Sequence, residues 1–121
     1  MPIKLKNVGI AVRDLEAAIA FFTDLGLTVL RRDTVSGEWT DTAVGLDGNQ
    51  ANIAMLQTPD GNDCIELFEY IHPDAIETKP TRPNEIGMHR AALVHRLGRL
   101  PADRYGMSPK GTAEAAGILI A

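Results

Sequence analysis

The feature that most constrains the fold is a change of hydrophobic period within residues 6–26, K-N-V-G-I-A-V-R-D-L-E-A-A-I-A-F-F-T-D-L-G. From Val8 to Val12 every second residue is apolar and branched, which is the period of a half-buried strand. From Leu15 to Leu25 the large apolar residues recur every three or four positions, which is the period of an amphipathic helix. The stretch therefore predicts a strand that runs directly into a helix.

The ends of this helix are also marked in the sequence. Asp14 is a good N-cap, Glu16 suits the positive end of the helix dipole, and Gly26 can adopt the left-handed conformation that ends a helix. A further strand is expected at once, over Leu27–Arg31, before the sequence becomes polar. The order β-α-β is thus predicted for the first thirty residues.

The next forty residues read as further strands separated by turns. Strands are expected where β-branched or alternating residues lie between turn signals. The predicted strands are Trp39–Leu46, Ala51–Gln57 and Cys64–Tyr70. The last two are joined by the loop Thr58–Asn62, whose Pro, Asp, Gly and Asn residues are typical of a hairpin connection. Residues 1–70 are therefore interpreted as one module of the β-α-β-β-β type, with one strand more among those predicted than this pattern requires.

The rest of the chain divides into a linker and a second segment. Residues 71–86 contain three prolines and no usable period, so they are interpreted as an extended linker. The pattern restarts at residues 87–94, G-M-H-R-A-A-L-V, in which Met88–Val94 match Lys6–Val12 in phase. This favours a second module over residues 87–121. Gly117–Ala121 is expected to form the start of a last strand.

The stretch N-V-G-I-A-V-R-D-L-E-A-A-I-A-F-F-T-D-L-G-L resembles the opening of the vicinal oxygen chelate superfamily. This superfamily includes glyoxalase I, bleomycin resistance proteins, extradiol dioxygenases and methylmalonyl-CoA epimerase. The resemblance implies an α+β fold in which two βαβββ modules lie side by side and form an open, barrel-like cleft. A whole second module needs a helix and three strands after Val94, on the order of 45 residues, so the second module is expected to be shortened. Unpaired strand edges would then favour a homodimer.

The resemblance also implies a metal site in the cleft. The ligand positions of the family, carried over by strand position, fall on Asn7, Glu66 and His89, with a fourth at or near Ala121. A histidine with a carboxylate suits Zn²⁺, Mn²⁺, Fe²⁺ or Ni²⁺. The amide of Asn7 would be a weak ligand or a substrate contact, and Glu66 would be a ligand or a catalytic base. Ala121 offers no side-chain donor.

Taken without the resemblance, the same residues have less specific interpretations. Glu66 is predicted to share its face of the strand with Cys64 and Phe68, and it could be a solvated acid on an edge strand or a cleft residue with a partner. His89 could be an ordinary core or surface histidine. Cys64 is interpreted as a small buried hydrophobe. Trp39 could contact substrate, or equally lie in the core or in an interface.

Composition excludes several classes of partner. The net charge of −4 argues against nucleic acid, which usually needs a basic stripe. No apolar run approaches the ~20 residues of a membrane span, and the start of the chain lacks the apolar core of a signal peptide. The single cysteine allows no disulfide within the chain. A cytoplasmic protein with a small-molecule substrate or ligand is expected.

Three functions remain open. The first is a metal-dependent lyase, isomerase or dioxygenase that acts on a small molecule with vicinal oxygens. The second is a metal-free dimer that binds a small molecule, as the drug-binding bleomycin resistance proteins of the family do. The third is a degenerate, non-catalytic relative.

Overall fold

The structure, a computed structural model, describes residues 2–79, 82–88, 91–94 and 117–120. The chain divides into two compact units, Met1–Ile76 and Glu77–Ala121. The elements of the first unit are β1 (Val8–Ala11), α1 (Leu15–Asp24), β2 (Thr28–Ser36), α2 (Glu38–Val44), β3 (Gln50–Gln57) and β4 (Cys64–His72). Those of the second unit are β5 (Ala91–Val94) and β6 (Gly117–Ile120).

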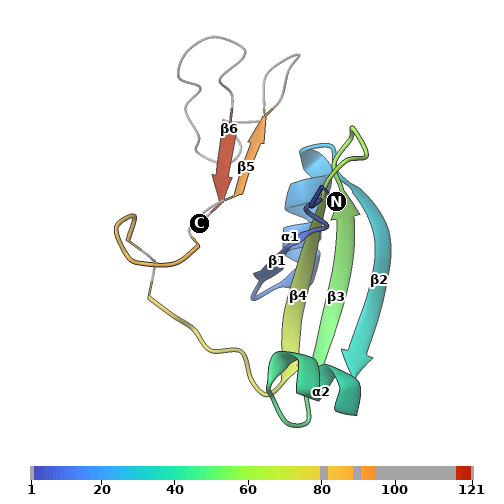
Figure 1. Cartoon of the computed structure of the whole chain (residues 1–121), viewed down its shortest axis with the longest axis vertical. Helices are drawn as coiled ribbons and strands as arrows, with labels where there is room; N and C mark the ends of the chain where they lie inside the picture. The colour runs from blue at the N-terminus through green and yellow to red at the C-terminus, as the bar shows by residue number, and fades with distance from the viewer. Residues whose placement is uncertain (1, 80–81, 89–90, 95–116, 121) are drawn as a thin grey trace. The chain divides into compact units, whose positions relative to one another are not determined.

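The first unit is built on a four-stranded sheet with the strand order β1-β4-β3-β2 (Figure 1). β1 runs parallel to β4. β4 pairs antiparallel with β3, and β3 pairs antiparallel with β2. Helix α1 connects β1 to β2, which lies at the opposite edge of the sheet and runs in the same direction as β1. A parallel strand cannot be reached through a tight turn, so a crossover connection is required. The predicted α+β class and the βαβββ order of the first module are confirmed, with α2 inserted between β2 and β3.

Helix α1 begins and ends where the sequence indicates. The Asp14 side chain accepts a hydrogen bond of 3.1 Å from the backbone N–H of Ala17, as an N-cap does. Gly26, just after the helix, has a φ of +107°, a conformation that side-chain-bearing residues rarely adopt. The helix buries Leu15, Ile19 and Phe22. These three lie four or three positions apart, so they form one stripe.

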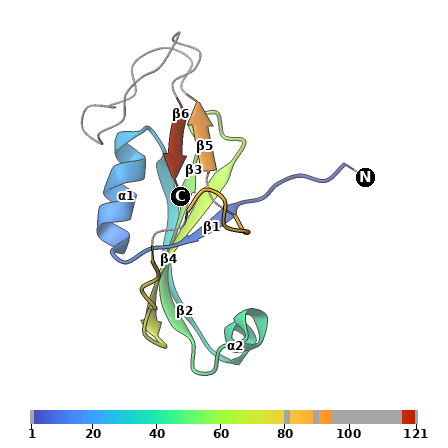
Figure 2. The same ribbon diagram turned by 90° about the vertical axis from the view of Figure 1, so that its left-hand side faces the viewer.

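The core lies between α1 and the sheet. Its centre consists of Leu56 on β3 and Leu67 on β4, the largest side chains that are fully buried. Other members of the apolar core are Leu15, Ile19, Phe22, Leu27, Ala54 and Ile65. Figure 2 shows α1 on one side of the sheet and the short α2 near one end of the other side. Most of that second face, here called the open face, has no helix over it.

Helix α2 corrects the prediction of a strand over Trp39–Leu46. Residues Glu38–Val44 are helical although tryptophan, threonine and valine favour strands. The residues that follow favour the helix. Gly45 ends it in the left-handed conformation, with a φ of +74°. Asp41 then holds the following loop, because its carboxylate accepts the backbone N–H groups of Gly48 and Asn49 at 3.0 and 2.7 Å. Trp39 is 81% exposed, which excludes the core of the chain from the alternatives left open for it.

Two strands are longer than the sequence indicates. β2 continues through the polar run from Arg31 to Ser36, with a register shift between Val29 and Arg31. It is an edge strand of its sheet, where charged side chains remain in solvent and discourage pairing with other chains. β4 continues through Ile71 and His72, two residues into the segment interpreted as a linker.

The second unit contains an antiparallel pair of strands, β5 and β6, in which Ala91 pairs with Ile120 and Val94 with Gly117. The predicted strand near Gly117 is therefore present. Its pairing differs from that in the first module, where the first and last strands run parallel. The described strands thus do not repeat the β1–β4 arrangement. His89 and Ala121, together with residues 95–116, lie outside the described residues, and the division of the chain at residues 70 and 86 stays a prediction.

Leu67→Ala is expected to lower the free energy of unfolding of the first unit by about 2–5 kcal/mol, because it opens a cavity at a fully buried position. The measurement is urea unfolding followed by circular dichroism. Leu5→Ala is the matched control, since Leu5 is 62% exposed and the same atoms are removed from a solvated site. Equal losses in both variants would contradict this assignment of the core.

The β3–β4 hairpin loop should stabilise the fold in a pH-dependent way. Hydrogen bonds hold the pKa of the Asp60 carboxyl below its ordinary value. The largest effect comes from the Thr58 hydroxyl, and the next from the backbone N–H of Asn62, both of which donate to the carboxylate. A carboxyl whose pKa is lowered by folding contributes stability above its unfolded pKa, and this contribution is lost as the pH falls through its folded pKa. Asp60→Asn should therefore lower the melting temperature at pH 7, and the difference from wild type should shrink as the pH approaches 3. Asp74→Asn, which removes the charge of another exposed aspartate outside this loop, is the matched control.

Candidate functional site

The open face of the sheet carries the residues for which the sequence predicts a role. In register, Gly9 of β1 and Met55 of β3 flank Glu66 of β4 on its two sides. Residues paired across neighbouring strands point to the same face, and residues two apart along a strand do so too. Cys64, Glu66 and Phe68 therefore share the open face, as predicted, while Ile65 and Leu67 are buried under α1.

Glu66 is half-buried near the middle of this face. Among the described residues, no hydrogen bond or ion pair reaches its carboxylate. A half-buried carboxylate without a protein partner keeps acceptor capacity for a bound group. The partner that the sequence analysis expected for Glu66 is thus not supplied by the described part of the chain.

Asn7 lies just before β1 and reaches across the sheet. Its side-chain nitrogen Nδ2 lies 3.9 Å from the sulfur Sδ of Met55 on β3. Since β4 separates β1 from β3, this contact passes over β4, at the level of Cys64–Glu66. Asn7 and Glu66, two of the three predicted metal ligands, are therefore on one face of adjacent strands.

Aromatic side chains continue the open face along β4. The rings of Phe68 and Tyr70 meet edge to face, with centroids 5.8 Å apart. A Cβ atom on Gly9 would come within 3.2 Å of the Phe68 ring, so the absence of a side chain at Gly9 leaves the space that the ring uses. Around Glu66 the face thus combines the amide of Asn7, the thioether of Met55, the free thiol of Cys64 and two aromatic rings. By register it also carries Gln57 of β3 and, at the β2 edge, Arg31 and Asp33.

The metal set predicted from the resemblance is only partly described. Asn7 and Glu66 lie as stated above, whereas His89 and Ala121 are outside the described residues. Within the part of the chain that the structure describes, no group of three or more His, Cys, Asp or Glu side chains is close enough to hold a metal ion. The donors present fit a divalent ion as an incomplete, all-oxygen set of one carboxylate and one amide, which needs further ligands.

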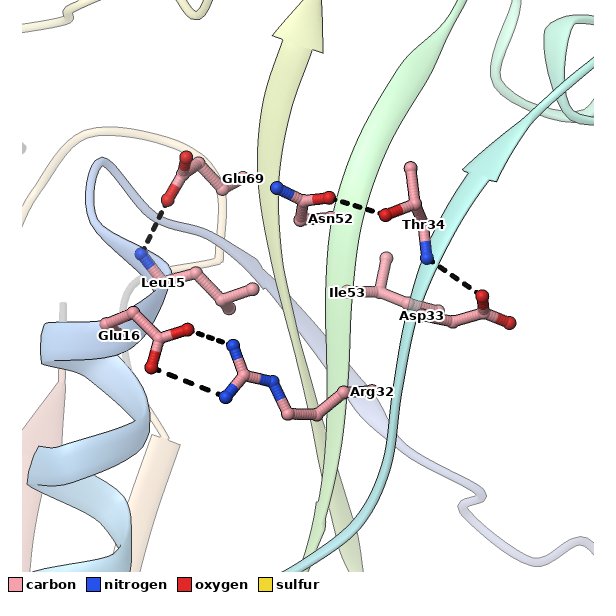
Figure 3. A pocket seen from close by; sticks show the side chains of 8 residues that line it. All are labelled: Leu15, Glu16, Arg32, Asp33, Thr34, Asn52, Ile53 and Glu69. Carbon is pink, nitrogen blue, oxygen red and sulfur yellow. Dashed lines mark hydrogen bonds and ion pairs between the residues drawn. The ribbon is translucent and has the colours of Figure 1, made fainter.

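A hollow of about 420 Å³ lies on the face of the sheet that carries α1 (Figure 3). It is lined by Leu15, Glu16, Arg32, Asp33, Thr34, Asn52, Ile53 and Glu69. One oxygen of Glu69 accepts the backbone N–H of Leu15 at 2.7 Å, and the Thr34 hydroxyl donates to Oδ1 of Asn52 at 2.7 Å. The sequence analysis did not identify this hollow, because its residues come from four separate elements.

An ion pair borders the same hollow. The guanidinium of Arg32 on β2 binds the carboxylate of Glu16 in the first turn of α1. The hydrogen bond to Glu16 raises the pKa of Arg32 above its ordinary value. Both side chains are largely exposed, so this pair contributes little to stability in salt solution. The polar groups that line the hollow mostly satisfy one another.

The sequence matches a known family over nearly its whole length. Residues 6–121 match the Glyoxalase/Bleomycin resistance protein/Dioxygenase superfamily. The fold is similar to the crystal structure of a glyoxalase family protein from Bacillus cereus, with a TM-score of 0.67 and 38% sequence identity. That match covers 73% of this chain and 60% of the Bacillus cereus chain, which is less than two thirds of the latter. The comparison with curated proteins found no match.

The chain therefore belongs to the glyoxalase/bleomycin resistance protein/dioxygenase superfamily, as the opening β-α-β stretch predicts. No helix in the described parts of the chain is long and apolar enough to cross a membrane.

The contact between Glu69 and the start of α1 gives a test of how the helix is held. Glu69→Ala should lower the free energy of unfolding by about 1 kcal/mol, because the first N–H of the helix loses an acceptor and its dipole loses a negative charge. Glu69→Gln keeps an acceptor oxygen and should lose clearly less. Urea midpoints of the two variants decide, and equal losses would show that the hydrogen bond does not anchor the helix.

Proposed function

We propose that the protein is a metal-dependent enzyme of the vicinal oxygen type, which binds a small substrate on the open face of the sheet. The observation that supports this most is that Asn7, just before β1, and Glu66, on the adjacent strand β4, lie on the same face of the sheet. Membership of the superfamily provides the context. The reaction class would be that of a lyase, an isomerase or a dioxygenase.

In this proposal, Glu66 and Asn7 hold a divalent ion together with His89. The ion would supply the Lewis acidity that stabilises negative charge on two neighbouring substrate oxygens. Glu66 has the acceptor capacity for either of two roles, as a ligand or as a base that takes a proton from substrate. Phe68 and Tyr70 would cover the apolar part of the substrate and keep water away from the reacting atoms.

The test is the metal content of the whole chain, by elemental analysis of protein purified without chelators and then supplied with Mn²⁺, Ni²⁺, Fe²⁺ or Zn²⁺. Near-stoichiometric metal in the wild type, and its loss in Glu66→Gln and in His89→Ala, is expected. Glu69→Gln is the matched control, because it changes the same charge on the same strand but on the opposite face, where Glu69 contacts Leu15. It should keep the metal.

The proposal is wrong as stated if no metal binds the wild type under any of these conditions, or if Glu66→Gln and Glu69→Gln lose metal equally. Once stoichiometric binding is established, 2-oxoaldehydes, diketones and catechols are the substrates to screen, since each presents two neighbouring oxygens to one ion.

A second candidate function is metal-free binding of a flat small molecule. The edge-to-face pair of Phe68 and Tyr70, beside the thioether of Met55, favours this function. Aromatic ligands would then raise the melting temperature equally in the presence and in the absence of a chelator, and Glu66→Gln would keep that response. Metal dependence of the response would instead favour the enzyme.

A further inference from the structure

We propose that Met55 is a positioning residue that turns the side-chain oxygen of Asn7 toward bound ligand. The inference deepens the proposed function and rests on it, because it assigns to the same site a residue that sets the chemistry Asn7 presents. Met55 itself would touch neither metal nor substrate.

The contact between the two side chains fixes which end of the amide faces the sulfur. Sδ of Met55 lies 3.9 Å from Nδ2 of Asn7. A thioether sulfur can accept a hydrogen bond but has no proton to donate. If the amide were turned over, its oxygen would face the sulfur and two acceptors would oppose each other. The orientation with nitrogen toward Met55 is therefore the favoured one.

The position of the contact decides what this orientation achieves. Met55 pairs with Glu66, and Asn7 precedes the residue that pairs with Ile65, so the bridge from Asn7 to Met55 crosses β4 beside Glu66. With nitrogen held by the sulfur, Oδ1 of Asn7 is directed away from Met55 and stays available. Asn7 then adds an acceptor oxygen to the carboxylate of Glu66, and not a competing N–H donor.

The consequence is a preference for a class of ligand. An ionised carboxylate has only acceptor atoms, and an amide presented through its oxygen adds another. Two acceptor groups on one face favour a divalent cation over an anion or a bare carbonyl oxygen, against the opposing positive charge of Arg31, which pairs with Met55 on the same face. A freely turning Asn7 would offer its N–H₂ group for part of the time and would weaken cation binding accordingly.

The substitution that tests this is Met55→Leu in the full chain. It preserves volume and apolar character, so the fold should be kept, and it removes only the acceptor. Met88→Leu is the matched control, because Met88 is 82% exposed and undergoes the same chemical change. The melting temperatures without metal should agree among the three proteins.

The first readout is nuclear magnetic resonance of the Asn7 side-chain NH₂ group in ¹⁵N-labelled protein, assigned through its disappearance in Asn7→Asp. Met55→Leu should move these signals and speed their exchange with water, whereas Met88→Leu should leave both unchanged. This readout needs no metal, so it tests the contact even if the proposed metal function fails. Unchanged Asn7 signals in Met55→Leu would overturn the inference.

The second readout is Mn²⁺ affinity. Residues that orient a metal ligand typically change affinity by about tenfold or more when replaced, and Met55→Leu should weaken Mn²⁺ binding by about that factor. In an Asn7→Ala background, Met55→Leu should cause no further loss, because it acts only through Asn7. If the losses of Mn²⁺ affinity caused by the two substitutions multiply in the double variant, Met55 acts independently of Asn7, and the inference is overturned. A wild type that binds no Mn²⁺ would refute the metal function and the cation-selecting role, while the amide signals would still decide the Asn7–Met55 contact.

Discussion

The parallel pairing of β1 with β4 is the constraint on which the rest of the first unit depends. These are the first and last strands of the module, and they are neighbours in the sheet. The chain must therefore cross over one face through α1, and that helix brings Leu15, Ile19 and Phe22 onto the sheet. Glu69 of β4 ties the start of the helix to the last strand through the N–H of Leu15. Among the described elements of the first unit, α1 thus covers one face and leaves most of the other without a helix.

The periodic parts of the fold could be predicted from the sequence. The alternation at Val8–Val12, the helical stripe after Asp14 and the hairpin between β3 and β4 each follow from local chemistry, and each is present. The orientation of Glu66 follows equally well, because a strand has two faces and Ile65 and Leu67 occupy the buried one. The period of the apolar residues and the face they form are sufficient to predict an element whose conformation is decided by burial of one side.

The parts that failed are those where burial does not decide. No residue of α2 is buried, so the strand preference of its side chains had no packing to support it, and Gly45 with the Asp41-held loop set the conformation. β2 was predicted too short for a related reason. Its charged end carries no apolar pattern, yet the backbone continues to pair with β3 as far as Ser36. Backbone hydrogen bonding extends a strand beyond the reach of its hydrophobic signal.

The candidate site shows the same limit at the level of single contacts. The sequence predicts that Asn7 and Glu66 share a face, but the meeting of Asn7 with Met55 depends on the register of three strands at once. Gly9, on the same face, has no side chain, which leaves the Phe68 ring its place. Because the sulfur of Met55 can only accept, the chemistry offered by Asn7 is decided by a residue on a strand two places away in the sheet. A ligand set read from positions alone identifies which donors are near one another, whereas the neighbours of each donor determine which atom it presents.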